Sequence, residues 1–188
     1  MKRRAFLTSG AGVAAFVLAG HRPAFADLEP DRLWSTYRRY HLMIVGQRND
    51  ERAISLAGAV VAVLAGFLPA SRAQLARAAD TRRVGVLIAT NQQDVAIMAA
   101  ESADALFLAK APFDDIRDVP LRLIVALGSH VLVCRTDFSS RHAVRLRAQT
   151  LAEHEDALPM PASAPQGLIP AHRGSQAFFT GEECPHDI

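Results

Sequence analysis

The sequence predicts an α/β domain with a mostly parallel sheet that is covered by helices on both faces. Short apolar runs, of the length of buried strands, alternate with longer segments of helical period. The longest apolar run after the N-terminal segment is Pro120–Phe138. It contains two predicted strands, Leu121–Leu127 and His130–Arg135, separated by Gly128 and Ser129. With 188 residues, of which 50% are hydrophobic, the chain is long enough for one compact core.

The first predicted elements are a strand, a polar turn and a long helix. His41–Val45 is an apolar run that ends at Gly46, which favours a buried strand. Asn49 or Asp50 in the following turn can cap a helix. Apolar residues at steps of three and four predict that helix over Ala53–Leu68. A helix of this length rises roughly 24 Å, less than the roughly 30 Å of a bilayer core, so we expect a buried helix and not a membrane span.

The remaining elements follow from the same rules. Capping serines and an apolar stripe predict a long helix after the central run. The residues after it are Pro-rich and extended before a last short helix. The predicted helices are Ser71–Asp80, Arg82–Thr90, Glu101–Lys110, a helix capped by Ser139 or Ser140 that runs to about Ala157, and Gly174–Gly181, and the remaining strand is Asp94–Met98.

The N-terminus is typical of an export signal. It has a basic start at Lys2–Arg4, a weakly apolar run over Ala5–Gly20 and a small-x-small cleavage site at Ala24–Ala26. A membrane anchor is the alternative, but the run is short and interrupted by glycines. Arg3–Leu7 matches the twin-arginine pattern. We therefore expect a signal peptide over residues 1–26, cleavage after Ala26 and a periplasmic protein, with a binding lobe over residues 27–158 and a tail over residues 159–188.

The charge balance changes when the signal is removed. Four of the 21 basic residues and none of the 19 acidic residues lie in residues 1–26. The mature chain then has 17 basic residues against 19 acidic ones, a net charge of −2. Nucleic-acid binding therefore has no electrostatic basis.

The two cysteines leave two readings open. Cys134 lies in an apolar predicted strand and Cys184 in the polar tail. An oxidising compartment permits a disulfide between them. The alternative is one buried thiol and one exposed thiol.

No residue pattern predicts a reaction or a metal. His172, Cys184 and His186 in the tail could gather around an ion, but solvated or capping histidines are the default reading. Ser140 and His142 lack the glycines of a nucleophile elbow. We predict no enzyme, no metal and no cofactor.

A candidate ligand site follows from the predicted fold class. In open α/β sheets, ligands bind at the carboxyl ends of strands, next to helix N-termini. Arg48 in this region could clamp a carboxylate, and the alternative is a solvated loop arginine. The candidate residues are Gly46, Gln47, Arg48, Asn49, Ala99 and Glu101.

Several segments, in their order, resemble one known family. They are His41–Gly46 followed by Ala53–Leu68, then Leu87–Met98, the strand pair Pro120–Arg135 and the closing Ile169–Phe179. The chain resembles the TAXI type of TRAP-transporter solute-binding proteins. That resemblance implies a fold of the type II periplasmic-binding-protein kind, in three layers. It also implies an exported protein that delivers a small carboxylate to a membrane permease.

The chain differs from the family pattern in two ways. It passes from Arg135 to the C-terminal helix with no room for a second lobe, so it resembles one lobe only. The family's Gly- and Thr-rich ligand loop is Gln47–Asp50 here, and its Gln-Ser-Asp turn is Ala99–Glu101. We therefore expect the cleft to be completed by a second copy or a partner protein. The alternative is a degenerate lobe that acts as a periplasmic interaction protein without a solute.

Overall fold

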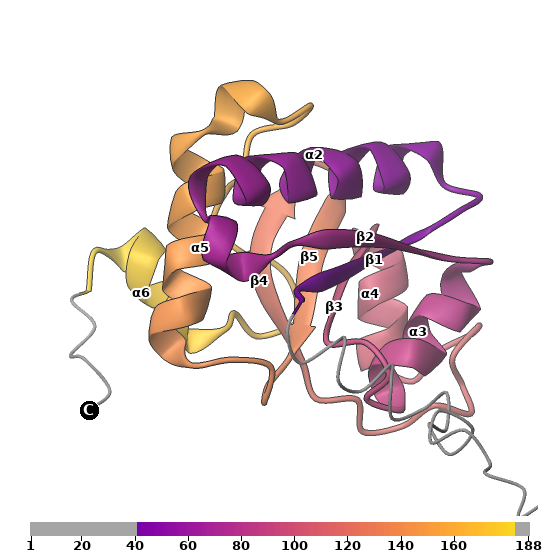
Figure 1. Ribbon diagram of the computed structural model, residues 1–188. Coiled ribbons are helices and arrows are strands. Elements are labelled where there is room, and N and C mark those ends of the chain that lie inside the picture. The colour runs from indigo at the N-terminus through magenta and orange to yellow at the C-terminus, as the bar shows by residue number, and fades with distance from the viewer. Residues whose placement is uncertain (1–40, 183–188) are drawn as a thin grey trace, which may run out of the picture.

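The computed structural model describes residues 41–182, which form one five-stranded sheet flanked by helices (Figure 1). The predicted signal peptide and Cys184 lie outside the described residues. The strands are β1 (Met43–Gln47), β2 (Gln74–Ala78), β3 (Val95–Ala99), β4 (Leu121–Leu127) and β5 (His130–Arg135). The helices are α2 (Glu51–Phe67), α3 (Thr81–Ala89), α4 (Ala100–Phe107), α5 (Arg141–Glu153) and α6 (Arg173–Thr180), with 3-10 turns at η1 (Pro69–Ser71) and η2 (Glu155–Ala157).

The sheet is mixed, in the order β2-β1-β3-β5-β4. Strand β1 runs parallel to both β2 and β3, whereas β5 runs antiparallel to both β3 and β4. The sequence predicted a mostly parallel sheet, but parallel pairs do not predominate over antiparallel pairs. The reason is local: Gly128 and Ser129 join β4 to β5 as a hairpin, and antiparallel strands need only a two-residue connection. Gly128 has a φ of 64°, which suits the first position of such a turn.

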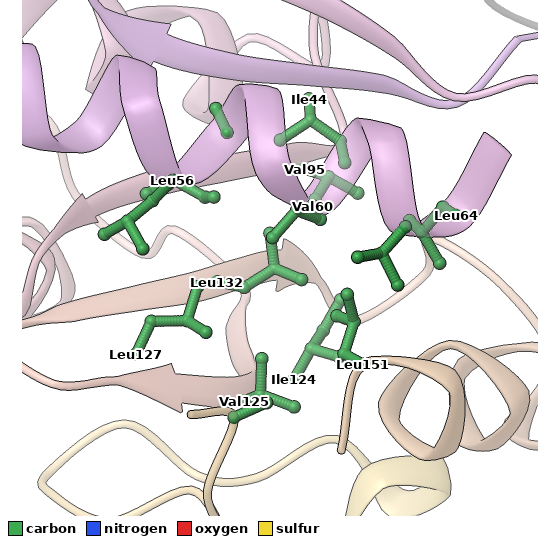
Figure 2. Close-up of a cluster of buried hydrophobic side chains, with 14 of the residues drawn as sticks. Ile44, Leu56, Val60, Leu64, Val95, Ile124, Val125, Leu127, Leu132 and Leu151 are labelled. Carbon is green, nitrogen blue, oxygen red and sulfur yellow. The ribbon is translucent and has the colours of Figure 1, made fainter. Parts of the chain in front are cut away.

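Helices cover both faces of the sheet, as expected for three layers. One face packs against α2 and α5, and the other packs against α3 and α4. Figure 2 shows Leu56, Val60 and Leu64 of α2 meeting Ile124 and Leu132 from the strands. Each such fully buried aliphatic side chain stabilises the fold by about 1.5–3 kcal/mol. None of the helices in the described part of the chain has the length and apolar character that a membrane span requires.

The prediction of a helix over Ser71–Asp80 is wrong. It contains the strand β2, which lies at an edge of the sheet. Its Ala, Arg, Gln and Leu residues favour a helix in isolation. Pairing with β1 overrides this preference, because the backbone of β2 completes the ladder from Met43–Gln74 to Gln47–Ala78.

The tail covers the opposite edge of the sheet. Ser163 and Ala126 exchange two backbone hydrogen bonds, of 2.9 and 3.0 Å, beside β4. Leu123 pairs in the same way with Pro170 and His172, at 3.0 and 2.8 Å. The predicted last helix is confirmed as α6, which lies beside α5 (Figure 1).

Candidate functional site

The predicted ligand residues gather at one end of the strands, where β1 and β3 end and α2 and α4 begin. The turn between β4 and β5 reaches the same edge, because the backbone N–H of Ala100 donates to Ser129 O at 2.9 Å. We call residues 47–50, 99–101 and 129–130 the carboxyl edge. Sequence reasoning placed the first two segments there but not the third.

The six predicted residues contribute unequally to this edge. Gly46 is buried, and a Cβ at its position would lie 3.1 Å from Ile54 Cδ1, so its role is to let α2 approach β1. The side chain of Gln47 is half-buried, and its Oε1 accepts a hydrogen bond from Thr81 Oγ1. Ala99 is half-buried and carries no polar side chain. The exposed members are Arg48, Asn49 and Glu101.

Arg48 is held by its backbone, since its N–H donates to Ala78 O at 2.8 Å. Its side chain is exposed to solvent. Its role as a carboxylate clamp stays a prediction.

A chain of three polar side chains, missed from the sequence, crosses the carboxyl edge. His130 Nε2 lies 3.0 Å from Asp50 Oδ2, and His130 Nδ1 lies 3.1 Å from Ser129 Oγ. Asp50 is also the N-cap of α2, because its Oδ1 accepts from the N–H of Ala53 at 2.9 Å. The sequence indicated Asn49 or Asp50 as the cap, and the structure uses Asp50. It could not indicate the contact with His130, which joins residues 80 positions apart.

The charge state of Asp50 decides the tautomer of His130. Partial burial tends to raise the pKa of Asp50, but hydrogen bonds from the Ala53 N–H and from His130 outweigh it, so this pKa lies below its usual value. Asp50 is therefore ionised at neutral pH, and an ionised carboxylate only accepts. His130 Nε2 therefore carries the proton of this hydrogen bond, and His130 Nδ1 lies 3.1 Å from the Ser129 hydroxyl oxygen. His130 is only 6% exposed, whereas Ser129 is exposed to solvent.

The start of α4 has donors left for a ligand. Ala99, the residue before the helix, forms no side-chain cap. The first N–H groups of a helix have no partner inside the helix, and here only Ala100 is bound by the neighbouring turn. The N–H groups that follow Ala100 at the start of α4 favour an anion, and Ser129, whose carbonyl binds the Ala100 N–H, is an exposed residue next to this helix start.

Two other predicted sites can be placed in part. Cys134 has no exposed surface and forms no disulfide within residues 41–182, and burial raises the pKa of its thiol to about 12. Since Cys184 lies outside residues 41–182, the pairing of the two cysteines stays a prediction. His172 caps α6, because its Nδ1 accepts from the N–H of Gly174 at 3.1 Å. Within the described residues, no three His, Cys, Asp or Glu side chains come together as a metal site.

The chain is thus an α/β domain with a mixed sheet and a polar edge where two helices begin. Comparison with protein-family models, with curated proteins and with solved structures found no match.

Proposed function

We propose that this chain is an exported binding protein for a small carboxylate, similar to one lobe of a TAXI-type solute-binding protein and linked to TRAP-type uptake. The observation that carries the proposal is the uncapped start of α4 beside the exposed hydroxyl of Ser129. Backbone N–H groups at a helix N-terminus suit a carboxylate group, and the Ser129 hydroxyl becomes a further donor when it turns from His130 Nδ1 to the ligand. The strand ends of a sheet are also where α/β proteins bind their ligands.

The charges around this edge define where the carboxylate sits. The negative charge of the Asp50 carboxylate is already partly offset by its contacts with His130 and the Ala53 N–H. It therefore repels an incoming anion less than a free carboxylate would. Exposed Arg48 adds positive charge to the edge, and exposed Glu101 adds negative charge. The proposal places the carboxylate at the start of α4, next to Ser129. A second copy or a partner protein closes the open side of this edge, as a second lobe does in two-lobed binding proteins.

Replacing Ser129 by alanine is expected to weaken carboxylate binding by roughly 10- to 100-fold, the usual range for one hydrogen bond to a charged group. The measurement is calorimetric titration of the mature protein with a panel of small mono- and dicarboxylates, after native mass spectrometry for any acid that copurifies. Ser55→Ala, at an exposed serine of α2, is the matched control and should leave the affinity unchanged. No heat from any acid, or no acid that Ser129→Ala binds more weakly than the wild type does, would contradict the proposal.

The alternative is a periplasmic interaction protein without a solute. It is favoured by the internal use of the Gln47 and Asp50 side chains, which bind Thr81 and His130 instead of facing solvent freely. The same native mass spectra separate the two functions. A copurified polypeptide with no small acid would favour the interaction protein.

Export is tested at the N-terminus, which lies outside the described residues. Changing Arg3 and Arg4 to lysine is expected to abolish export, because the twin-arginine route depends on the arginine pair. Periplasmic and cytoplasmic fractions of the source cell would be compared for the wild type and the double variant. Normal export of the double variant would eliminate this route.

A further inference from the structure

A pocket of about 330 Å³ lies at the other end of the strands from the carboxyl edge. It opens where β1 and β3 begin and where β5 ends, and we call it the amino-edge pocket. Its wall includes Ser71 from η1, Gln93 from the turn before β3, Phe138 and Ser139 after β5, and Arg147 from α5. The size is that of a site for a small molecule.

Arg147 brings a positive charge to the wall of this pocket. Burial lowers its pKa, and within the described part of the chain no carboxylate forms an ion pair with it. The central carbon of its guanidinium lies 5.1 Å from the centre of the Phe138 ring, within the range of a cation–π contact. One of its terminal nitrogens donates a long hydrogen bond of 3.4 Å to Ser139 Oγ. A largely buried cation with so few acceptors lacks an anion.

Further polar atoms in the same wall lack partners. Ser71 Oγ, Gln93 Oε1 and Arg147 Nε are buried and form no hydrogen bond with any residue between 41 and 182. Native proteins satisfy nearly all such atoms, so unpaired ones need an explanation. Gln93 Oε1 can only accept, which means that its missing partner is an N–H or O–H group. Arg147 can only donate, which means that its missing partner is an acceptor. One ligand with both kinds of group would serve both residues.

We propose that the amino-edge pocket binds a small monocarboxylate that also carries a hydroxyl or ammonium group. The carboxylate pairs with the terminal nitrogens of Arg147, whose planar fork matches it. The hydroxyl or ammonium donates to Gln93 Oε1. Asp94 lines the same pocket, and its negative charge disfavours a second carboxylate on the ligand. This site is separate from the one at Ser129, because the length of the strands lies between them.

The probes are L-lactate and glycine, with propionate and succinate as comparisons. The mature protein is titrated with each acid and followed by calorimetry and by its thermal midpoint. Lactate or glycine should bind at least about 10-fold more tightly than propionate, because propionate leaves Gln93 Oε1 unpaired. Succinate should bind more weakly than lactate. Equal affinities for lactate, glycine and propionate, or no binding of lactate and glycine, would overturn the proposal.

Arg147→Met keeps much of the side-chain volume and removes the charge. It should reduce the binding of the preferred probe on the order of 100-fold. It should not lower the thermal midpoint without ligand, since it removes a partly buried cation that no carboxylate of the described residues neutralises. Arg145→Met, on the same helix but outside the pocket wall, should leave the affinity unchanged. The Ser129→Ala variant should bind the preferred probe with the affinity of the wild type. This result would distinguish the amino-edge pocket from the carboxyl edge. Unchanged binding in Arg147→Met, or a clear loss of its stability without ligand, would show that Arg147 has another role.

Discussion

Replacing Gly174 by alanine is expected to destabilise the domain by about 3 kcal/mol or more. Gly174 lies at the start of α6, where this helix packs against α5. A Cβ at this position would come closer than 3.0 Å to the carbonyl oxygen of Arg141 and would lie 2.8 Å from Arg145 N. Both are backbone atoms of α5, so no side chain can rotate away. The helices would have to separate, which would pull Ser175 Oγ from its buried acceptor, Ile124 O.

The measurement is urea unfolding of the wild type and of Gly174→Ala, with a thermal midpoint expected to fall by roughly 6 °C or more. Gly58→Ala and Gly66→Ala in α2 are the matched controls, because a Cβ at either position meets nothing within 4 Å. Each control should gain roughly 0.5–1 kcal/mol, the usual difference between alanine and glycine inside a helix. If Gly174→Ala stabilised the domain as the two controls should, this result would contradict the close packing of α5 on α6.

Replacing Asp50 by alanine is expected to cost about 2–4 kcal/mol. The loss of an N-cap costs about 0.5–2 kcal/mol, and a buried polar group without a partner costs about 1–3 kcal/mol. Both apply here, because Asp50 caps the 17 residues of α2 and binds the buried His130. Asp50→Asn should cost less, since asparagine caps helices as well as aspartate does. Equal losses in the two variants would show that the carboxylate bond to His130 carries the stability and the cap does not.

The stability that the Asp50 charge provides should disappear in acid. The pKa of Asp50 is lower in the folded protein than its usual value, so the folded state binds fewer protons than the unfolded state. This stabilisation is complete above the unfolded pKa of about 4 and is lost as the pH falls through the folded pKa. The difference in unfolding free energy between the wild type and Asp50→Asn should therefore narrow below about pH 4. A difference that stayed constant from neutral pH to strong acid would contradict the role of the charge.

The local patterns of the sequence were sufficient to predict most helices and strands. The hairpin strands Leu121–Leu127 and His130–Arg135 agree with the prediction residue for residue, and the helix predicted over Ala53–Leu68 is α2 at Glu51–Phe67. These elements are long or strongly apolar, so their own periodicity outweighs any distant contact. Helices on both faces of the sheet followed from the alternation of strands and helices.

Residues 71–80 show where local patterns fail. Their composition suits a helix, and only the ladder with β1 makes Gln74–Ala78 a strand. The direction of β5 was undecided for a related reason. A short connection permits a hairpin, but the insertion of β5 between β3 and β4 depends on pairing with a strand formed about 30 residues earlier.

The sequence by itself determined the α/β class, the position of most helices and strands and the edge at which Gln47–Asp50 and Ala99–Glu101 meet. Only the tertiary structure decided the partners of the polar side chains. It joined Asp50 to His130 and placed Arg147 in a pocket with Gln93. The physical reason is that apolar periodicity repeats along the chain and can be read locally. A hydrogen bond or an unpaired charge depends instead on residues that only the folded sheet brings together.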